Sequence, residues 1–566
     1  MVKFSDMAYK RPDFDAVFQK MQGLLTDMRE AANAEGFIRS LMNLDEEAAH
    51  LSTQGTLASV RHSIDTRDAF YGKENDLFDE NMPRFGEIFN TCARICLESP
   101  YRSALEKRFG SYFMAKYEVA LKTFKPEIVE DLVEENKLST AYEKLLASAQ
   151  IDFDGQTYNL SGLSPFQQVP DRDTRRRAND AAFGWLAAHE KDLDDYYDKL
   201  VKVRDRIAHK LGFDNFIPVA YARMGRTDWD YQDARVYREQ IARSVVPFAN
   251  RLRRAQAERI GIENPKNFDY NLQFLSGNPK PQGDETYLVG KASEMYHALS
   301  RETGDFFDVM TSCELMDLTT KPGKRGGGYM TEFADYRVPF IFSNFNGTSG
   351  DVDVLTHEAG HAFQGYLQRD VKPSQLKEMT MEVAETHSMS MEFFTHPWMP
   401  GFFGPDTEKY YYSHVADSVE FLPYGASIDE FQEWVYLHVD ATPAERRLKY
   451  REIEKKYLPH LDYNGLKYLE DGGKWQRQHH VYSMPFYYLD YTISQVCAFQ
   501  YFAWDQKDHA AAWQSYLTFC RRAGQVPFKE LVKACGLKSP FEPGCIDSVL
   551  PALERFLDGR NQEKIR

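Results

Sequence analysis

The chain of 566 residues is 43% hydrophobic and can bury a sizeable core, yet no apolar run approaches the roughly 20 residues that span a bilayer. Its net charge of −16 argues against nucleic acid or an anionic membrane as a partner. The N-terminal residues lack the features of a secretory signal, and the seven cysteines are few and odd in number. We therefore expect free thiols and a cytoplasmic protein.

The first part of the chain is predicted to be mainly helical. From Asp13 onward, apolar residues between Phe14 and Met28 recur at the spacing of an amphipathic helix. The segment from Gln150 to Leu160 alternates around a turn, which predicts a small hairpin. We place a boundary near residue 165. Further helices are predicted at Pro83–Leu97, Pro100–Lys122 and Lys125–Ala147.

A glycine run and an apolar strand follow in the middle of the chain. Gly326, Gly327 and Gly328 precede Tyr329, and consecutive glycines permit unusual dihedral angles and close backbone approach. The run predicts either a flexible surface loop or a loop that closes on a ligand. The apolar run Phe340–Phe342 predicts a strand.

The motif His357-Glu358-Ala-Gly-His361 is the most informative feature of the chain. Two histidines four residues apart on a helix project from one face and can bind a single zinc ion. Glu358 directly follows the first histidine, which places its carboxylate where it can take a proton from an attacking water. The sequence thus predicts a catalytic zinc site on a helix. Apolar residues around the motif have helical spacing: Leu355, Ala359, Ala362, Phe363 and Tyr366.

A catalytic zinc usually has three protein ligands and one open position, so a third ligand is required. A second helix is predicted from Ser374 to Phe394, and Glu378, Glu382 and Glu385 share one of its faces. Any of the three glutamates fits as the ligand, with another orienting a ligand histidine. Two nearby histidines are weaker candidates: His387 and His396.

The segment from Gln478 to Tyr491 contains two histidines and four tyrosines. A tyrosine hydroxyl can donate a hydrogen bond to an oxyanion without carrying charge, and one such donor is worth about 3 kcal/mol. The alternative interpretation is an aromatic core helix, because aromatic residues at helical spacing usually pack.

These motifs together carry a family resemblance. His357–Gln364, followed by Glu385–Ser388 and Glu392, resembles the oligoendopeptidase F and Pz-peptidase branch of the thimet-oligopeptidase-like zinc metallopeptidases. The resemblance implies that Glu385 is the third zinc ligand. Gln364 departs from a histidine common in the larger enzymes of the family, but that position is not a ligand there.

The resemblance also implies roles outside the metal centre. Gly327, Gly328 and Tyr329 would lie over a peptide substrate, and the edge of the Phe340–Phe342 strand would pair with its main chain. In the family, a histidine and a tyrosine-rich segment face the zinc and donate to the tetrahedral intermediate. By position, the matching residues are His480, Tyr488 and Tyr491, with His479 and Tyr487 as neighbours and Tyr487 on the substrate side.

The fold implied by the resemblance is mainly α, with two helical lobes around a deep substrate channel and a small β-sheet beside the zinc-binding helix. Residues 1–165 are then an N-terminal helical region, and residues 166–566 are a zinc metallopeptidase catalytic domain. The implied enzyme is a one-zinc metalloendopeptidase that cleaves short oligopeptides and excludes folded proteins by channel size.

Three alternatives to this interpretation stay open, and one is a helical scaffold with an accidental motif, which would bind no stoichiometric zinc. A zinc carboxypeptidase or dipeptidase would share the motif but would need a group that binds a free terminus. A noncatalytic zinc-binding helical protein would use a closed site with four protein ligands. The sequence leaves the oligomeric state open.

Overall fold

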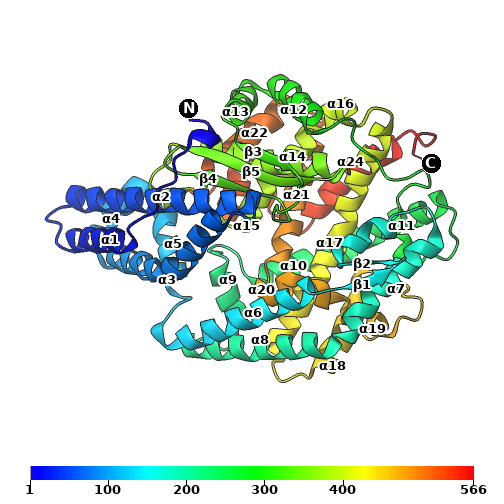
Figure 1. Cartoon of the computed structure of the whole chain (residues 1–566), viewed down its shortest axis with the longest axis horizontal. Helices are drawn as coiled ribbons and strands as arrows, with labels where there is room; N and C mark the ends of the chain where they lie inside the picture. The colour runs from blue at the N-terminus through cyan, green and yellow to red at the C-terminus, as the bar shows by residue number, and fades with distance from the viewer. Residues whose placement is uncertain (1, 566) are drawn as a thin grey trace. The chain divides into compact units, whose positions relative to one another are not determined.

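The computed structural model describes residues 2–565 and is mainly helical, with two small sheets (Figure 1). The prediction of a mainly α fold with a small sheet beside the motif helix is confirmed. No helix within the described residues is both long and apolar enough to cross a membrane.

The chain divides into two compact units, each assembled from three separate stretches of sequence. The predicted domain boundary near residue 165 stays a prediction. The stretches are Met1–Leu121, Lys280–Pro405 and Gln500–Leu537 for unit 1, and Lys122–Pro279, Asp406–Phe499 and Lys538–Arg566 for unit 2.

Unit 1 begins with helices that share an apolar core. The Asp13 carboxylate accepts a hydrogen bond from the Ala16 amide, which starts the first helix where the sequence predicts it. The third helix begins at Ala69, well before the predicted start at Pro83, because Asp68 caps it and Pro83 is accommodated inside. These helices are α1 (Phe14–Arg29), α2 (Ala34–Ile64), α3 (Ala69–Glu98), α4 (Arg102–Phe109) and α5 (Ser111–Leu121).

The predicted helix from Pro100 to Lys122 is divided into α4 and α5. Gly110, which lies between them, has a φ of +89°, a conformation that a helix cannot contain and that glycine adopts without strain.

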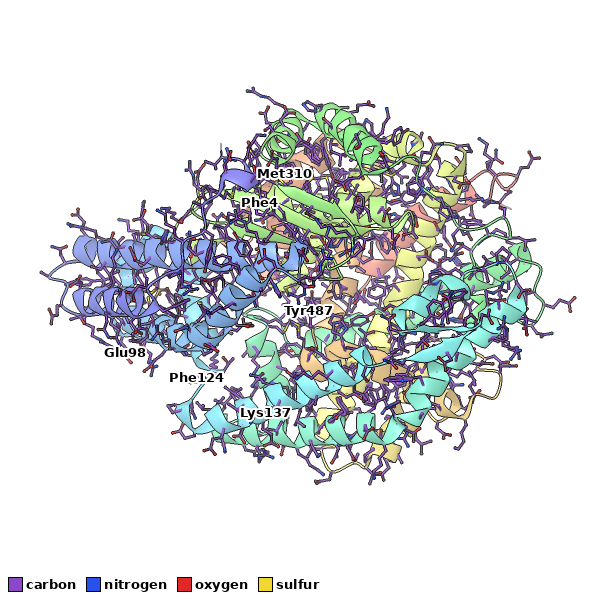
Figure 2. All side chains as sticks on the ribbon, viewed as in Figure 1. Phe4, Glu98, Phe124, Lys137, Met310 and Tyr487 are labelled. Carbon is purple, nitrogen blue, oxygen red and sulfur yellow. The ribbon has the colours of Figure 1, made fainter. Side chains whose placement is uncertain are left out.

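The second stretch of unit 1 contains a three-stranded sheet. The strands are β3 (Met316–Thr319), β4 (Tyr329–Phe333) and β5 (Val338–Phe345), in the order β3-β5-β4, and Figure 1 shows them side by side. Strand β5 pairs parallel with β3 and antiparallel with β4, so it is central and β4 is an edge strand. Phe4, labelled in Figure 2, packs its ring against Phe333 and Phe340.

The position of β5 makes one sequence prediction wrong. Phe340–Phe342 does form a strand, but its main chain pairs with strands on both sides at Ile341 and Phe342. The two edges that remain for an extended peptide belong to β3 and β4, and β4 is the one that directly follows the glycine run.

The remaining helices of unit 1 precede or follow this sheet in sequence. They are α12 (Glu285–Leu299), α13 (Arg301–Ser312), α14 (Gly350–Leu367), α15 (Met381–Phe394), α16 (Met399–Phe403), α22 (His509–Arg522) and α23 (Phe528–Ala534).

Unit 2 contains a hairpin and the other helices. The predicted hairpin is confirmed: β1 (Ile151–Phe153) and β2 (Gln156–Tyr158) pair antiparallel. Asp154 and Gly155 both have positive φ, as a tight two-residue hairpin turn requires. The helices are α6 (Val129–Ala147), α7 (Arg172–Ala188), α8 (Glu190–Leu211), α9 (Ile217–Arg223), α10 (Tyr231–Gln240), α11 (Val246–Arg259), α17 (Thr407–Leu437), α18 (Pro443–Tyr457), α19 (Lys467–Glu470), α20 (His479–Ser483), α21 (Tyr488–Asp505, which continues into unit 1) and α24 (Cys545–Asp558).

Candidate metal centre

Helix α14 carries both histidines of the motif on one face, as the sequence predicts. His357 and His361 lie one turn apart, with ring centroids separated by 5.0 Å. The helix begins at Gly350, and the Asp351 carboxylate accepts hydrogen bonds from the amides of Asn346 and Gly347. A side chain in the first turn of α14 therefore holds the preceding turn in place.

A glycine in the motif lets α15 approach α14 closely. A Cβ atom on Gly360 would lie 2.7 Å from the Cα atom of Ser388 and 3.1 Å from the carbonyl oxygen of His387. The first distance is too short for any Cβ atom and the second is tight, so only glycine fits the crossing as it stands. The close crossing brings the side chain of Glu385 to the histidines.

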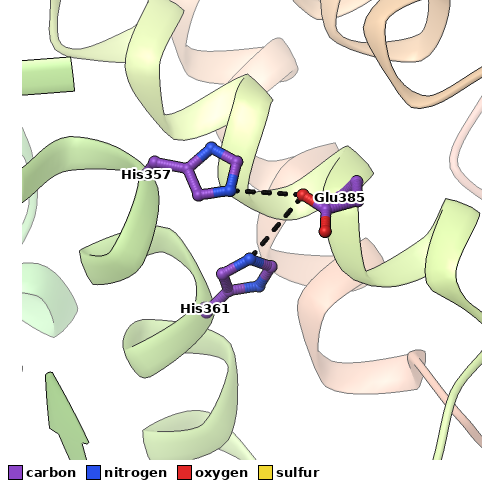
Figure 3. A group of neighbouring side chains, drawn as sticks. All are labelled: His357, His361 and Glu385. Atoms are coloured by element: carbon purple, nitrogen blue, oxygen red, sulfur yellow. Dashed lines mark ion pairs between the residues drawn. The ribbon is translucent and has the colours of Figure 1, made fainter. Parts of the chain in front are cut away.

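Three side chains converge at this crossing (Figure 3). The Oε2 atom of Glu385 lies 3.2 Å from Nε2 of His357 and 3.8 Å from Nε2 of His361. One ligand atom from each residue lies within 4.8 Å of the others. Two imidazole nitrogens and one carboxylate oxygen are a donor set that suits zinc, with a fourth position left open, so the residues fit a catalytic ion.

Glu392 orients the first histidine. Its Oε1 atom lies 2.6 Å from Nδ1 of His357, so the Nδ1–H group donates to the carboxylate and leaves Nε2 available to a metal. Glu392 follows Glu385 by seven residues, which is two turns of α15, so both project from one face. The sequence predicts that Glu378 or Glu382 orients a ligand histidine. For His357 this prediction is wrong, because Glu392 makes the contact.

The predicted second helix begins later than expected, at Met381 instead of Ser374. The cause is Lys116 of α5, whose Nζ atom donates to the carbonyl oxygens of Gln375, Glu378 and Gly524 at 2.5 to 2.6 Å. The carbonyls of Gln375 and Glu378 are then directed to the lysine, and only a short 3-10 helix forms there, at Ser374–Leu376. Glu378 thus lies outside α15.

Glu358 is buried beside the edge strand. Burial raises the pKa of its carboxyl to about 7, and the charges of Glu385 and Glu392 act in the same direction. The charge of His357 opposes this rise, and so does the backbone amide of Met330 in β4, which donates to the carboxylate. For Glu385, burial alone would raise the pKa, but hydrogen bonding to His357 and its charge hold the pKa below its ordinary value.

The glycine run leads directly into β4. Gly327 has a φ of +95°, and its carbonyl oxygen accepts a hydrogen bond from Asn344 Nδ2 at 2.7 Å. A Cβ on Gly328 would touch Val354 of α14 at 3.4 Å, and the ring of Tyr329 stacks on Phe342. The run is thus an exposed loop tied to the sheet and next to the motif helix.

The weaker ligand candidates lie outside the three-residue group. His387 packs edge-on against the ring of His361 and is buried, while His396 packs against Phe393. Gln364 donates to the carbonyl oxygen of Cys520 in α22.

In unit 2, the predicted histidine and tyrosines form a cluster of their own. The ring centroid of His480 lies 5.4 Å from that of Tyr487, 5.1 Å from Tyr488 and 5.9 Å from Tyr491. The hydroxyl of Tyr487 donates to that of Tyr491 at 2.9 Å. Tyr487 is labelled in Figure 2.

Tyr482 belongs to the core and not to this cluster. It is buried, stacks on Tyr142 with ring centroids 3.7 Å apart, and donates a hydrogen bond to the carbonyl oxygen of Leu193.

Comparison with known proteins identifies the family. Residues 4–124 match the Peptidase M3 N-terminal domain, and residues 289–549 match Peptidase family M3. A solved chain assigned as an oligoendopeptidase F is 48% identical, with a TM-score of 0.92 and 100% of each chain covered. Pz peptidase A, solved with an inhibitor, is 47% identical, with a TM-score of 0.92 over 99% of this chain and 100% of that one.

A Bacillus anthracis chain assigned as an oligoendopeptidase F is 43% identical, with a TM-score of 0.88 over 100% of this chain and 99% of that one. The search of curated proteins gives no match. The chain belongs to peptidase family M3. It is therefore a metalloendopeptidase, as the sequence resemblance implies.

The structure of this M3 peptidase brings the sequence-predicted residues together in two groups. In unit 1, three candidate metal ligands converge at the crossing of α14 and α15: His357, His361 and Glu385. Glu358 lies on α14, and the glycine run leads into β4, which packs against α14. In unit 2, His480 is surrounded by the three predicted tyrosines. Sequence reasoning missed the contact of Glu392, which its two-turn spacing from Glu385 signals.

Proposed function

We propose that this M3 peptidase binds one zinc ion through His357, His361 and Glu385 and hydrolyses internal bonds of short oligopeptides. The convergence of these three side chains supports the proposal most directly. When bound, zinc supplies Lewis-acid chemistry toward water and a peptide carbonyl. The names of the similar proteins, oligoendopeptidase F and Pz peptidase A, support an oligopeptide substrate.

Glu358 is the general base of the proposed reaction. Its carboxylate takes a proton from the attacking water and later passes it to the leaving amine. Burial favours this cycle, because it raises the pKa of the carboxyl and so makes both protonation states accessible near neutral pH.

The substrate main chain is proposed to lie along β4. This strand is an edge of its sheet, and an edge strand can pair with an extended peptide through backbone hydrogen bonds. Gly327, Gly328 and Tyr329 then border the bound peptide. Such pairing depends on the main chain of the substrate more than on its side chains, so we expect the enzyme to accept peptides of many sequences.

The aromatic cluster of unit 2 is proposed to supply hydrogen-bond donors to the developing oxyanion. His480, Tyr488 and Tyr491 are the candidates, and Tyr487 lies on the substrate side. The hydroxyl of Tyr487 donates to that of Tyr491, so the two hydroxyls belong to one hydrogen-bonded group in this cluster. Such donors stabilise the charge that develops on the carbonyl oxygen.

We also propose a cytoplasmic location and selection of substrates by size. All seven cysteines are buried thiols, which fits a reducing compartment. Size selection follows from the channel that the family resemblance implies, and it would admit flexible oligopeptides while folded proteins are refused.

The test compares the native enzyme with Glu358→Gln on end-blocked quenched peptides of increasing length, with bound zinc measured in both. We expect one zinc per chain in both proteins, cleavage by the native enzyme only, and refusal of the longest substrates. Zinc bound without cleavage of any blocked peptide would instead favour an exopeptidase or a noncatalytic site.

A further inference from the structure

His480 makes one hydrogen bond that fixes the position of its proton. Its Nδ1 atom lies 2.7 Å from Nε2 of Gln478. An amide nitrogen donates and does not accept, so Nδ1 must be the acceptor in this contact. The proton of the neutral imidazole is then on Nε2.

The amide of Gln478 is itself held in this orientation. The hydroxyl of Tyr424, in α17, donates to Oε1 of Gln478 at 3.2 Å. Burial raises the pKa of Tyr424, so its hydroxyl stays protonated and remains a donor. In this orientation the amide makes both contacts, because it accepts from Tyr424 through Oε1 and donates to His480 through Nε2.

The surroundings of His480 favour its neutral form at neutral pH. Burial lowers the pKa of its imidazole to about 3, and the neighbouring ring of His479 acts in the same direction. The other groups that face it are the tyrosines of the cluster, and Glu143 acts on His479. A neutral imidazole has a single N–H group, so which nitrogen carries the proton decides whether it can donate.

We propose that Gln478, held by Tyr424, is a positioning residue that keeps His480 as the Nε2–H tautomer, able to donate to the substrate oxygen. The proposal rests on the proposed function, in which His480 is a donor to the oxyanion. Gln478 accepts a hydrogen bond from Tyr424 and donates one to His480.

Gln476, two residues before Gln478, provides a matched control. Tyr468 donates to Oε1 of Gln476 at 2.8 Å, which is the same kind of tyrosine-glutamine hydrogen bond in a buried setting. Gln476 Nε2 then donates to Asp194 and not to a histidine. Tyr468→Phe therefore removes a comparable bond with no path to the tautomer of His480.

The experiment measures kcat and KM against pH for Gln478→Glu, Gln478→Ala, Tyr424→Phe, Tyr468→Phe and His480→Ala. In Gln478→Glu, the neutral imidazole donates from Nδ1 to the new carboxylate, and its Nε2 loses the proton. The imidazolium form, with both nitrogens protonated, restores the donor. We therefore expect kcat to fall about 100-fold as pH rises through the raised pKa of His480.

The other variants are expected to behave differently. Gln478→Ala loses kcat about tenfold with no new descending limb, because both tautomers become accessible. Tyr424→Phe shows a smaller loss, and Tyr468→Phe keeps the native kcat and pH profile. Selective ¹⁵N-histidine spectra, assigned with His480→Ala, should show the Nε2–H tautomer in the native enzyme and the Nδ1–H tautomer in Gln478→Glu.

The two proposals fail in distinguishable ways. If His480→Ala keeps the native kcat, the role of His480 in the proposed function falls, and the positioning role falls with it. If His480→Ala loses activity while Gln478→Glu keeps the native pH profile and tautomer, only the positioning role of Gln478 is overturned. Circular dichroism and bound zinc establish that each variant is folded.

Discussion

Gly360 lies so close to Ser388 that a methyl group on the glycine would stand 2.7 Å from the Cα atom of the serine. This contact sets the distance between α14 and α15, and hence the distance between the motif histidines and Glu385. The geometry of the metal centre therefore depends on a residue that has no side chain.

Gly360→Ala is expected to push α15 away from α14. Overpacking of a close contact typically costs about 1–3 kcal/mol of stability, and here it also separates Glu385 from His357 and His361. We expect weaker zinc binding, measured by competition with a chelator, and a lower free energy of unfolding.

Gly365→Ala is the matched control on the same helix. A Cβ there meets only the Cε atom of Met330 at 3.9 Å. It should bind zinc normally and gain up to about 1 kcal/mol from helix propensity. Equal zinc affinities of the two alanine variants would contradict the role of the crossing.

Glu392→Ala is expected to reduce zinc affinity about 10- to 100-fold, because His357 loses the carboxylate that orients it. Glu378→Ala is the control, since Glu378 lies outside α15 and makes no contact with the ligand histidines among the interactions described. Titration of the metal-free variants with zinc measures both. A larger loss from Glu378→Ala would refute this assignment.

Lys116→Met is expected to destabilise unit 1 by about 3 kcal/mol or more, because three carbonyl oxygens lose a charged donor. The measurement is chemical unfolding at pH 7. Lys107→Met, at an exposed position on α4, should unfold like the native chain. An unchanged midpoint for Lys116→Met would mean that other groups or water satisfy these carbonyls.

Glu420 of α17 is expected to make the stability of unit 2 depend on pH. Burial raises the pKa of its carboxyl to about 8, against the opposing charge of Arg253. Since the unfolded value is near 4.5, the native state binds more protons between these limits, and its stability falls as pH rises toward 8. The slope is at most about 1.4 kcal/mol per pH unit.

Glu420→Gln should flatten this dependence and gain stability relative to the native chain at pH 8. Unfolding followed from pH 5 to pH 8 measures the difference. Glu452→Gln, whose side chain is 71% exposed, should keep the native slope. A native slope in Glu420→Gln would show that this carboxyl is already ionised in the folded protein.

The local part of the site could be predicted from the sequence. The spacing of His357 and His361 is a property of one helix, so periodicity alone places them on one face. The hairpin around Asp154 and Gly155 is equally local, because its turn depends on two adjacent residues.

The rest depends on contacts between distant segments, which no local pattern contains. Periodicity leaves three glutamates open as the third ligand, since the crossing at Gly360 decides which one reaches the histidines. The late start of α15 follows from Lys116, more than 250 residues earlier in the chain. The edge position of β4 follows from strand order, which pairs β5 on both sides.

The C-terminal end of the motif helix is held by hydrogen bonds to residues much later in the chain. Gln368, directly after α14, donates to the carbonyl oxygens of Cys520 and Ala523, which lie 152 and 155 positions later. During translation, the ribosome delivers both histidines and Glu385 long before these carbonyls exist. A nascent chain that stalls before this point holds every residue of the centre and lacks the anchor of the helix that presents it.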